Sequence, residues 1–257
     1  MNRLELYEIV ESFKNVSHII LLKFELHPFN TKETILRNFI AKASSLLNSI
    51  SILIKEDQIG EATALYRLLI ERYFYIEYLE KSGLYQEFKD WSFIKTFEIR
   101  NKMRSQTTFN SKDVKEELTD DDFQINLYQE LKSKKINWIE PKIEDFSKQI
   151  DLKLLYSLGY DLGSSYVHPR ADEGLWDALR IVKNEKKSEL VAVNLLNNSV
   201  LLSNAVLALA TYNSTVFFGT YLQAYCDTVF KILNKTHPYC SLKSIELKIS
   251  SELFEKN

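Results

Sequence analysis

The chain has 257 residues, of which 45% are hydrophobic and 26% charged, and its formal net charge at pH 7 is −2. This composition is typical of a globular protein and argues against nucleic-acid binding driven mainly by phosphate neutralisation, while a local basic groove stays open. Only six glycines and four prolines are present, so we expect long helices joined by few loops.

The periodicity of the apolar residues is helical along almost the whole chain. The three-and-four spacing predicts helices over residues 3–26, 31–56, 58–82, 84–105, 123–135, 143–166, 172–183, 188–234 and 241–255. We expect the 188–234 helix to bend near Asn213 or Gly219. No strand alternation and no internal repeat is found. The predicted fold class is therefore an all-α multi-helix bundle.

The ends of these helices carry recognisable signals. Thr31 is the expected N-cap of the second helix and Asp172 that of the helix at 172–183. The run Asp120–Asp122 predicts a loop or a helix start. We expect one domain over residues 1–257, in which residues 106–140 form an insertion or mobile segment, and a division into two domains there stays open.

The chain is expected to be cytoplasmic and without a membrane span. Its N-terminus lacks the basic and apolar regions of a signal peptide. Cys226 and Cys240 do not have ligand spacing and are interpreted as reduced thiols. The most apolar stretch, residues 191–212, contains Asn194 and Asn198, and burying such amides in lipid is costly, so we interpret it as a core helix.

The segment at 58–82 is apolar nearly all round, which predicts a central, buried helix. One face carries Leu65, Leu68, Leu69, Tyr73, Ile76 and Leu79, and the opposite stripe carries Gly60, Ala64, Arg67, Glu71, Phe74 and Tyr78. Arg67 and Glu71 are then a partly buried pair one turn apart. An exposed pair of this kind contributes only about 0.3–0.5 kcal/mol, so its presence indicates either a lock on helix register or a functional site.

A second candidate segment covers residues 157–174. Asp161, Ser165 and His168 would share one helix face if the helix reached Val167. Gly159 and Gly163 flank them, and a glycine inside a helix indicates the close approach of a backbone or a ligand. His168 either acts in chemistry or bonds the last carbonyls of its helix.

These two segments carry a family resemblance. The motifs AxxLYRLLIE (Ala62 to Glu71) and YxxxxDxxSxxxHP (Tyr156 to Pro169) resemble those of uncharacterised bacterial helical proteins related to the HEPN superfamily, the higher eukaryotes and prokaryotes nucleotide-binding bundles. The resemblance covers about residues 35–235. It implies an α-helical bundle, often dimeric, associated with toxin–antitoxin or phage-defence systems. Many HEPN proteins are metal-independent ribonucleases that use an Arg followed four to six residues later by a His.

The chain departs from that catalytic pattern, because no histidine has an Arg at the required distance before it. The family's catalytic Arg–His pair could be present here only if Arg67 and His168 meet in space. Even then, Glu71 would partly neutralise the charge of Arg67.

The leading hypothesis is an effector acting on RNA or nucleotides, in which Arg67 contacts an anionic group and His168 transfers a proton. Glu71 and Asp161 would orient them, and Ser165 and Tyr78 would contact substrate. No metal or cofactor is expected, because the Glu-x-x-His pattern of bundle metal sites is absent. The alternative is a non-catalytic interaction or regulatory module, in which the same polar residues fix helix register. Either could form a homodimer.

Overall fold

The computed structural model describes residues 1–25, 30–105, 120–134, 136–168, 174–183, 189–216 and 219–254. Every regular element in these ranges is a helix, so the all-α prediction is confirmed. The elements are α1 (Arg3–Glu25), α2 (Thr31–Lys55), α3 (Ile59–Ser82), α4 (Tyr85–Ser105), α6 (Asp122–Ser133), α7 (Ile143–Gln149), α8 (Lys153–Leu155), the π-helix η1 (Tyr156–Asp161), α9 (Leu162–Ser164), α10 (Leu175–Lys183), α11 (Glu189–Tyr212), α12 (Thr220–Leu233) and α13 (Lys243–Phe254).

The chain divides into two compact units. The larger contains residues 1–81 and 141–257, and the smaller contains residues 82–140. The predicted insertion at 106–140 overlaps the smaller unit, although residues 106–119 lie outside the described ranges.

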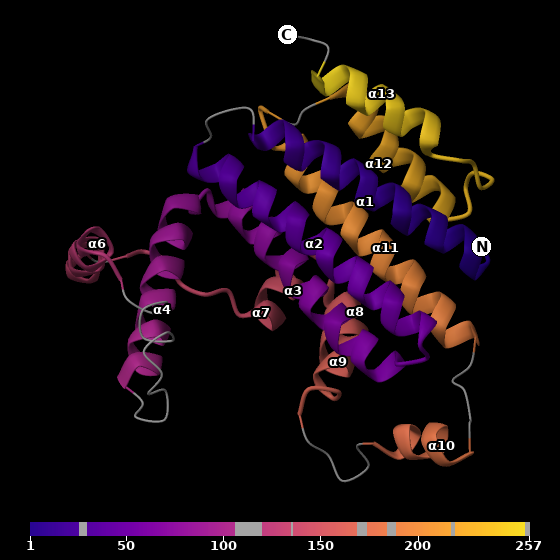
Figure 1. Ribbon diagram of the computed structural model, residues 1–257, viewed down its shortest axis with the longest axis horizontal. Helices are drawn as coiled ribbons and strands as arrows, with labels where there is room; N and C mark the ends of the chain where they lie inside the picture. Colours follow the sequence, from indigo (N-terminus) through magenta and orange to yellow (C-terminus); the bar gives the residue numbers. More distant parts are fainter. Residues whose placement is uncertain are drawn as a thin grey trace. The chain divides into compact units, whose positions relative to one another are not determined.

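The larger unit is a bundle built around α11, which packs against α1, α2 and α12, while α13 covers α1 and α12 (Figure 1). This position corrects the prediction that residues 58–82 form the central helix. Residues 58–82 were expected at the centre because they are apolar nearly all round. Helix α11 is amphipathic to an even smaller degree, since polar residues such as Ser199, Ser203 and Asn204 are buried on it, and it is α11 that lies at the centre. Asn204 is accommodated because its Nδ2 donates to the carbonyl of Cys226, at 2.9 Å.

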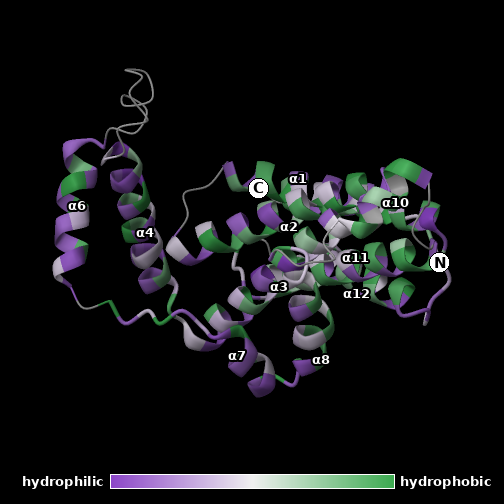
Figure 2. Ribbon diagram, turned by 90° about the horizontal axis from the view of Figure 1, so that it is seen from below, coloured by the Kyte–Doolittle hydropathy of each residue, from purple (hydrophilic) through white to green (hydrophobic). Residues whose placement is uncertain are grey.

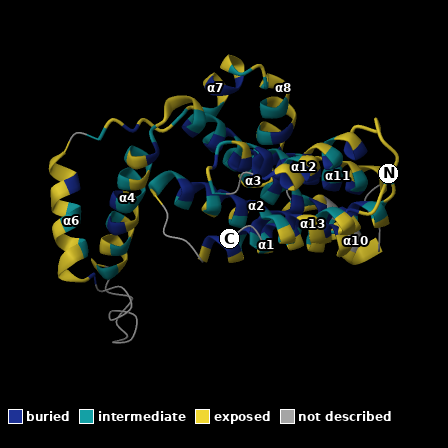
Figure 3. Cartoon of the chain, turned by 90° about the horizontal axis from the view of Figure 1, so that it is seen from above, coloured by how far each residue is buried: buried dark blue, intermediate teal, exposed yellow. Residues whose placement is uncertain are grey.

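Although α3 is not central, it is covered along nearly its whole length (Figure 3). All of its residues from 62 to 80 are buried or half-buried. Ala62, Tyr66, Ile70 and Phe74 form its most buried stripe, and burial raises the pKa of Tyr66 to about 12. The polar groups of α3 therefore face other protein groups more than water.

Figure 2 shows that apolar residues are spread over the helices of the bundle. By length and composition α11 could cross a membrane, since an 18-residue window has mean hydropathy 1.5, but half of that window is buried inside the protein. Core helices of bundles pass the same test. The packing of α11 against α1, α2 and α12 is accordingly that of a core helix, as the asparagines indicated.

Polar side chains cap the helices, in one case at a position other than the predicted one. Asn30 caps α2, because its side chain accepts a hydrogen bond from the Glu33 amide at 2.9 Å, so Thr31 is the first helical residue. The aspartate run is a helix start: Asp121 and Gln124 form a capping box at α6. Asp172 lies outside the described residues.

The helix predicted over 143–166 is interrupted twice. After α7 the chain turns through Asp151, whose φ of 57° lies in the left-handed region, and Leu152 N–H bonds back to the Ser147 carbonyl at 2.8 Å. Aspartate adopts this conformation more readily than most residues, so the helix ends without a glycine. The second interruption is the wider winding of η1.

The predicted helix over 188–234 is two helices, α11 and α12, separated between Asn213 and Gly219 as the bend signals suggested. Glu33 of α2 holds this junction. It is almost fully buried and accepts hydrogen bonds from the Ser214 hydroxyl at 2.5 Å and from the Thr215 amide and hydroxyl at 3.0 and 3.1 Å. These donors replace the water that the carboxylate loses on burial.

In the smaller unit, α4 lies beside α6. The Phe97 and Tyr128 rings stack at 4.2 Å between centroids. Asp120, whose side chain is fully buried, binds Arg100 at 2.8 Å and Arg104 at 2.5 Å. Two arginines around one buried carboxylate fasten the start of α6 to the last turns of α4.

Candidate functional site

The predicted Arg67–Glu71 pair is formed on α3. Arg67 Nη2 lies 3.2 Å from Glu71 Oε1, and the two side chains are only 16% and 18% exposed. Arg72 also approaches the Glu71 carboxylate, at 3.7 Å. This partial burial matches the sequence expectation and excludes an ordinary surface ion pair.

The partner that links this pair to another element is Tyr160 of η1. Arg67 Nη2 donates to the Tyr160 hydroxyl at 2.8 Å, and the guanidinium carbon lies 4.5 Å from the centre of the Tyr160 ring. Tyr156, one turn earlier, stacks on Tyr160 with 5.3 Å between centroids. The guanidinium is thus held by a carboxylate, a phenol oxygen and an aromatic face at once. We call Arg67, Glu71 and Tyr160 the arginine cluster.

Two glycines allow this close approach. A Cβ at Gly163 would lie 2.6 Å from Arg67 Cβ and 3.3 Å from the Thr63 carbonyl, and one at Gly159 would lie 2.4 Å from Ile70 Cδ1. The contact at Gly163 leaves no room for a side chain, whereas at Gly159 the end of the Ile70 side chain would have to move. The predicted reason for the glycines is therefore correct, and the group that approaches them is α3 itself.

The winding of η1 presents Tyr160 to α3. A π-helix holds one more residue per turn than an α-helix and commonly marks a functional position. Here it carries Tyr156, Tyr160 and Asp161. Burial, and then the neighbouring Asp161 carboxylate, raises the pKa of Tyr156 to about 12. The Tyr156 phenol therefore stays protonated at neutral pH.

Asp161, Ser165 and His168 do not form the predicted shared face through Val167. The regular helix ends at Ser164, and residues 165–167 form a turn. Asp161 and His168 are exposed, while the Ser165 hydroxyl donates to the Leu162 carbonyl at 2.6 Å. The serine is thereby committed to its own backbone.

No described contact joins His168 to the arginine cluster. Gly163 faces Arg67, whereas the Tyr166 ring lies against Gly60, where an added Cβ would be 3.3 Å away. Gly60 and Arg67 are seven positions apart, or about 10 Å along the helix axis. Among the described residues no hydrogen bond or ion pair joins His168 to Arg67 or to Glu71.

Tyr78, predicted to contact substrate, lies on α3 and packs edge-to-face on Phe146 of α7, with 5.4 Å between centroids. Tyr78 therefore packs α3 against α7. Within the described ranges, no group of three or more His, Cys, Asp or Glu side chains could hold a metal ion.

Sequence reasoning missed two polar positions. Tyr160 gave no signal because tyrosines are frequent in this chain and its spacing to Arg67 is set by folding. Glu33 gave no signal because acidic residues are common in the first turn of a helix. Its burial follows from the contact with the α11–α12 junction, which the local sequence does not indicate.

Residues 33–186 match a family described as a family of unknown function, DUF5677. The match spans more than half of the chain. The chain belongs to the DUF5677 family. The matched span contains all six predicted site residues, the arginine cluster, and the neighbouring Gly159 and Gly163. Helices α1, α11, α12 and α13 fall outside it. The comparisons with curated proteins and with solved structures found no match.

Proposed function

We propose that this DUF5677 protein is a non-catalytic helical interaction module that associates with a second copy of itself. The observation that supports this function is a stripe of exposed leucines on the segment from α8 to α9. Leu154, Leu158 and Leu162 are 71%, 65% and 55% exposed. The opposite face of the same segment is held against α3 by Tyr160, Gly159 and Gly163. The position of the leucine stripe is therefore fixed by these contacts with α3.

A second copy fits this stripe because the stripe is symmetric about Leu158. In an antiparallel two-fold pairing centred there, Leu154 of each copy meets Leu162 of the other. Covering the exposed parts of six leucines contributes roughly 6–11 kcal/mol. This gain is comparable with the entropic cost of association, so we expect a dimer that dissociates on dilution.

Sedimentation equilibrium over a range of concentrations tests the proposal. Leu158→Asp should convert the dimer to a monomer, because it places a charge at the centre of the stripe. Leu247→Asp is the matched control, since Leu247 is also 65% exposed but lies on α13. A wild-type protein that stays monomeric at high concentration, or a dimer that both variants retain, contradicts the proposal.

A second candidate function is that of a HEPN-like cytoplasmic defence or toxin-type effector acting on RNA or nucleotides. One further observation favours it beyond the resemblance. Arg67 Nε is buried and has no hydrogen-bond partner among the described residues, so the guanidinium retains a donor that a phosphate oxygen could use. No described hydrogen bond or ion pair joins Arg67 to His168, so a catalytic pair of these two residues rests on the resemblance alone.

Cleavage of a mixed RNA substrate by wild type, His168→Ala and Arg67→Met tests this second function. Loss of cleavage in both variants, with folding preserved, would support the effector function. Equal cleavage by all three, or no cleavage by any, would eliminate it.

A further inference from the structure

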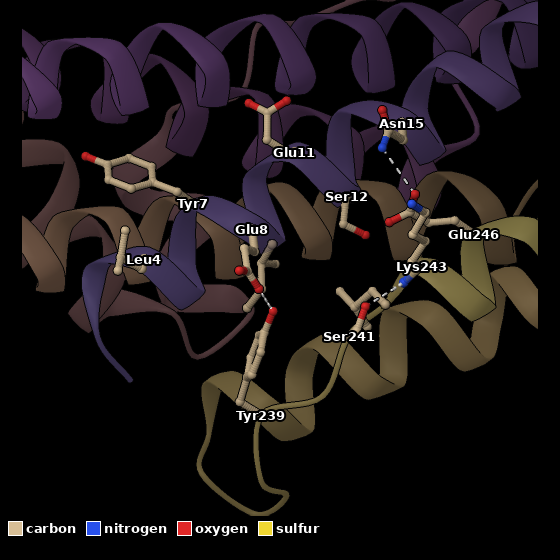
Figure 4. Close-up of a pocket in the computed structure, with 12 residues that line it drawn as sticks. Leu4, Tyr7, Glu8, Glu11, Ser12, Asn15, Tyr239, Ser241, Lys243 and Glu246 are labelled. Carbon is tan, nitrogen blue, oxygen red and sulfur yellow. Dashed lines mark hydrogen bonds between the residues drawn. The ribbon is translucent and has the colours of Figure 1, made fainter.

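A pocket outside the matched family span lies between the first half of α1 and the segment 239–246 that leads into α13 (Figure 4). Its volume is about 590 Å³. Glu8, Ser12 and Asn15 line it from α1, and Tyr239, Lys243 and Glu246 line it from the other side. This volume is ample for a small organic molecule.

Two carboxylates in this pocket are oriented by neutral donors, and neither forms an ion pair with Lys243, the basic residue that lines the same pocket. The Tyr239 hydroxyl donates to Glu8 Oε2, and Asn15 Nδ2 donates to Glu246 Oε2 at 3.1 Å. Among the described residues, no basic side chain forms an ion pair with Glu8 or Glu246. Each carboxylate keeps a second oxygen that can accept a hydrogen bond from a bound cation.

Ser12 adds a buried acceptor between the two carboxylates. It is only 5% exposed, and its hydroxyl has no hydrogen-bond partner among the described residues. Figure 4 shows this hydroxyl directed into the space between α1 and Ser241. A polar neighbour is the fully buried Tyr225: burial raises the pKa of its phenol, and Ser12 lowers that pKa, as a hydrogen-bonding group does, but the two hydroxyls do not reach hydrogen-bond geometry. An unpaired buried hydroxyl facing a pocket is a cost that a ligand can remove.

We propose that this pocket binds a linear aliphatic diamine, with one ammonium on Glu8 and the other on Glu246. Glu8 and Asn15, which holds Glu246, are seven residues apart on α1, or about 10 Å along its axis. An extended four- or five-carbon diamine with a hydrogen bond at each end has a length comparable with this separation along α1. Ser12 accepts from one ammonium, and Leu4, Ile9 and Leu242 line the path of the methylene chain.

Calorimetric titration of the full chain with putrescine, and with butylamine as the single-charge probe, tests the proposal. Putrescine should bind at least about tenfold more tightly than butylamine, because a second charge-assisted contact forms. Equal affinity for the two amines, or no heat of binding with putrescine at millimolar concentration, overturns it.

Variants locate the site. Glu8→Gln and Glu246→Gln should each weaken putrescine binding about tenfold and reduce the preference over butylamine. Glu25→Gln is the matched control, because Glu25 is an exposed carboxylate on the same helix that does not line the pocket, whereas Glu11 lines it and is paired with Lys14. An equal loss in all three variants would indicate a long-range charge effect and overturn the assignment.

Ser12→Ala separates binding from folding. It removes an unpaired buried hydroxyl, so thermal stability without ligand should be unchanged or higher, while putrescine affinity falls. A variant that binds putrescine as tightly as wild type would overturn the role of Ser12. A variant that unfolds at lower temperature would show instead that this hydroxyl serves the fold.

Discussion

The hydrogen bond from Arg67 to Tyr160 provides a measurable test of the arginine cluster. Tyr160→Phe removes the phenol oxygen and keeps the ring that the guanidinium covers. A hydrogen bond to a charged group contributes about 1.5–3 kcal/mol. Because the Arg67 side chain is 16% exposed and Nη2 also binds Glu71, we expect the free energy of unfolding to fall by about 1–2 kcal/mol.

Urea unfolding followed by circular dichroism measures this loss. Tyr156→Phe is the control, since Tyr156 stacks in the same aromatic pair without bonding to Arg67, and its effect should stay within about 0.5 kcal/mol. Combining Tyr160→Phe with Glu71→Gln should give a non-additive result, because both partners share one guanidinium. Additive losses, or equal losses in the two tyrosine variants, would refute a shared cluster.

Four further outcomes are expected from thermal or urea unfolding. Gly163→Ala should destabilise by about 1–3 kcal/mol, because its Cβ would overlap Arg67 and the Thr63 carbonyl; a gain of stability would disprove the close approach. Glu33→Gln should destabilise by about 1–3 kcal/mol, since the amide nitrogen cannot accept the hydrogen bonds at the α11–α12 junction, and an unchanged midpoint would contradict this. Asp120→Asn should lower the free energy of unfolding by about 3 kcal/mol at most and speed amide exchange in α6. Unaltered exchange would contradict the role of Arg100, Arg104 and the buried Asp120 in holding α6 to α4. The folded chain keeps the Tyr66 proton up to about pH 12, whereas the unfolded chain loses it near pH 10. The free energy of unfolding should therefore fall as the pH rises between these values, and it should fall less steeply in Tyr66→Phe. Equal slopes of the free energy of unfolding against pH in the two proteins would exclude Tyr66 as the cause.

The helices were predictable because their signals are local. Apolar spacing located nearly every helix to within a few residues, and Asp120–Asp122 did begin a helix. The unexpected break after α7 depends on Asp151 in a left-handed conformation, which aspartate accepts but does not require. The π-helix also carries no local signal, because its winding is selected by the contact of Tyr160 with α3.

The candidate site was predictable only as far as one helix determines it. Arg67 and Glu71 meet because they are one turn apart, and the glycines indicated a close approach. Their partner Tyr160 lies 93 residues away in the chain, so only folding identifies it. Whether His168 meets Arg67 also depends on folding, because no local pattern relates two residues on separate segments; the described contacts on this part of α3 are those of Gly163 with Arg67 and of Tyr166 with Gly60. The identity of the central helix likewise depended on tertiary packing.

The central claim is that the Arg67 guanidinium is committed to joining two helices. NMR of the arginine side-chain Nε–H groups, assigned through Arg67→Lys, tests it most directly during titration with a mononucleotide and with a short RNA. We predict a slowly exchanging Arg67 resonance that does not move with either ligand and that Tyr160→Phe shifts. An Arg67 resonance that moves on titration with nucleotide or RNA, at concentrations that leave the other arginines unchanged, would contradict the account.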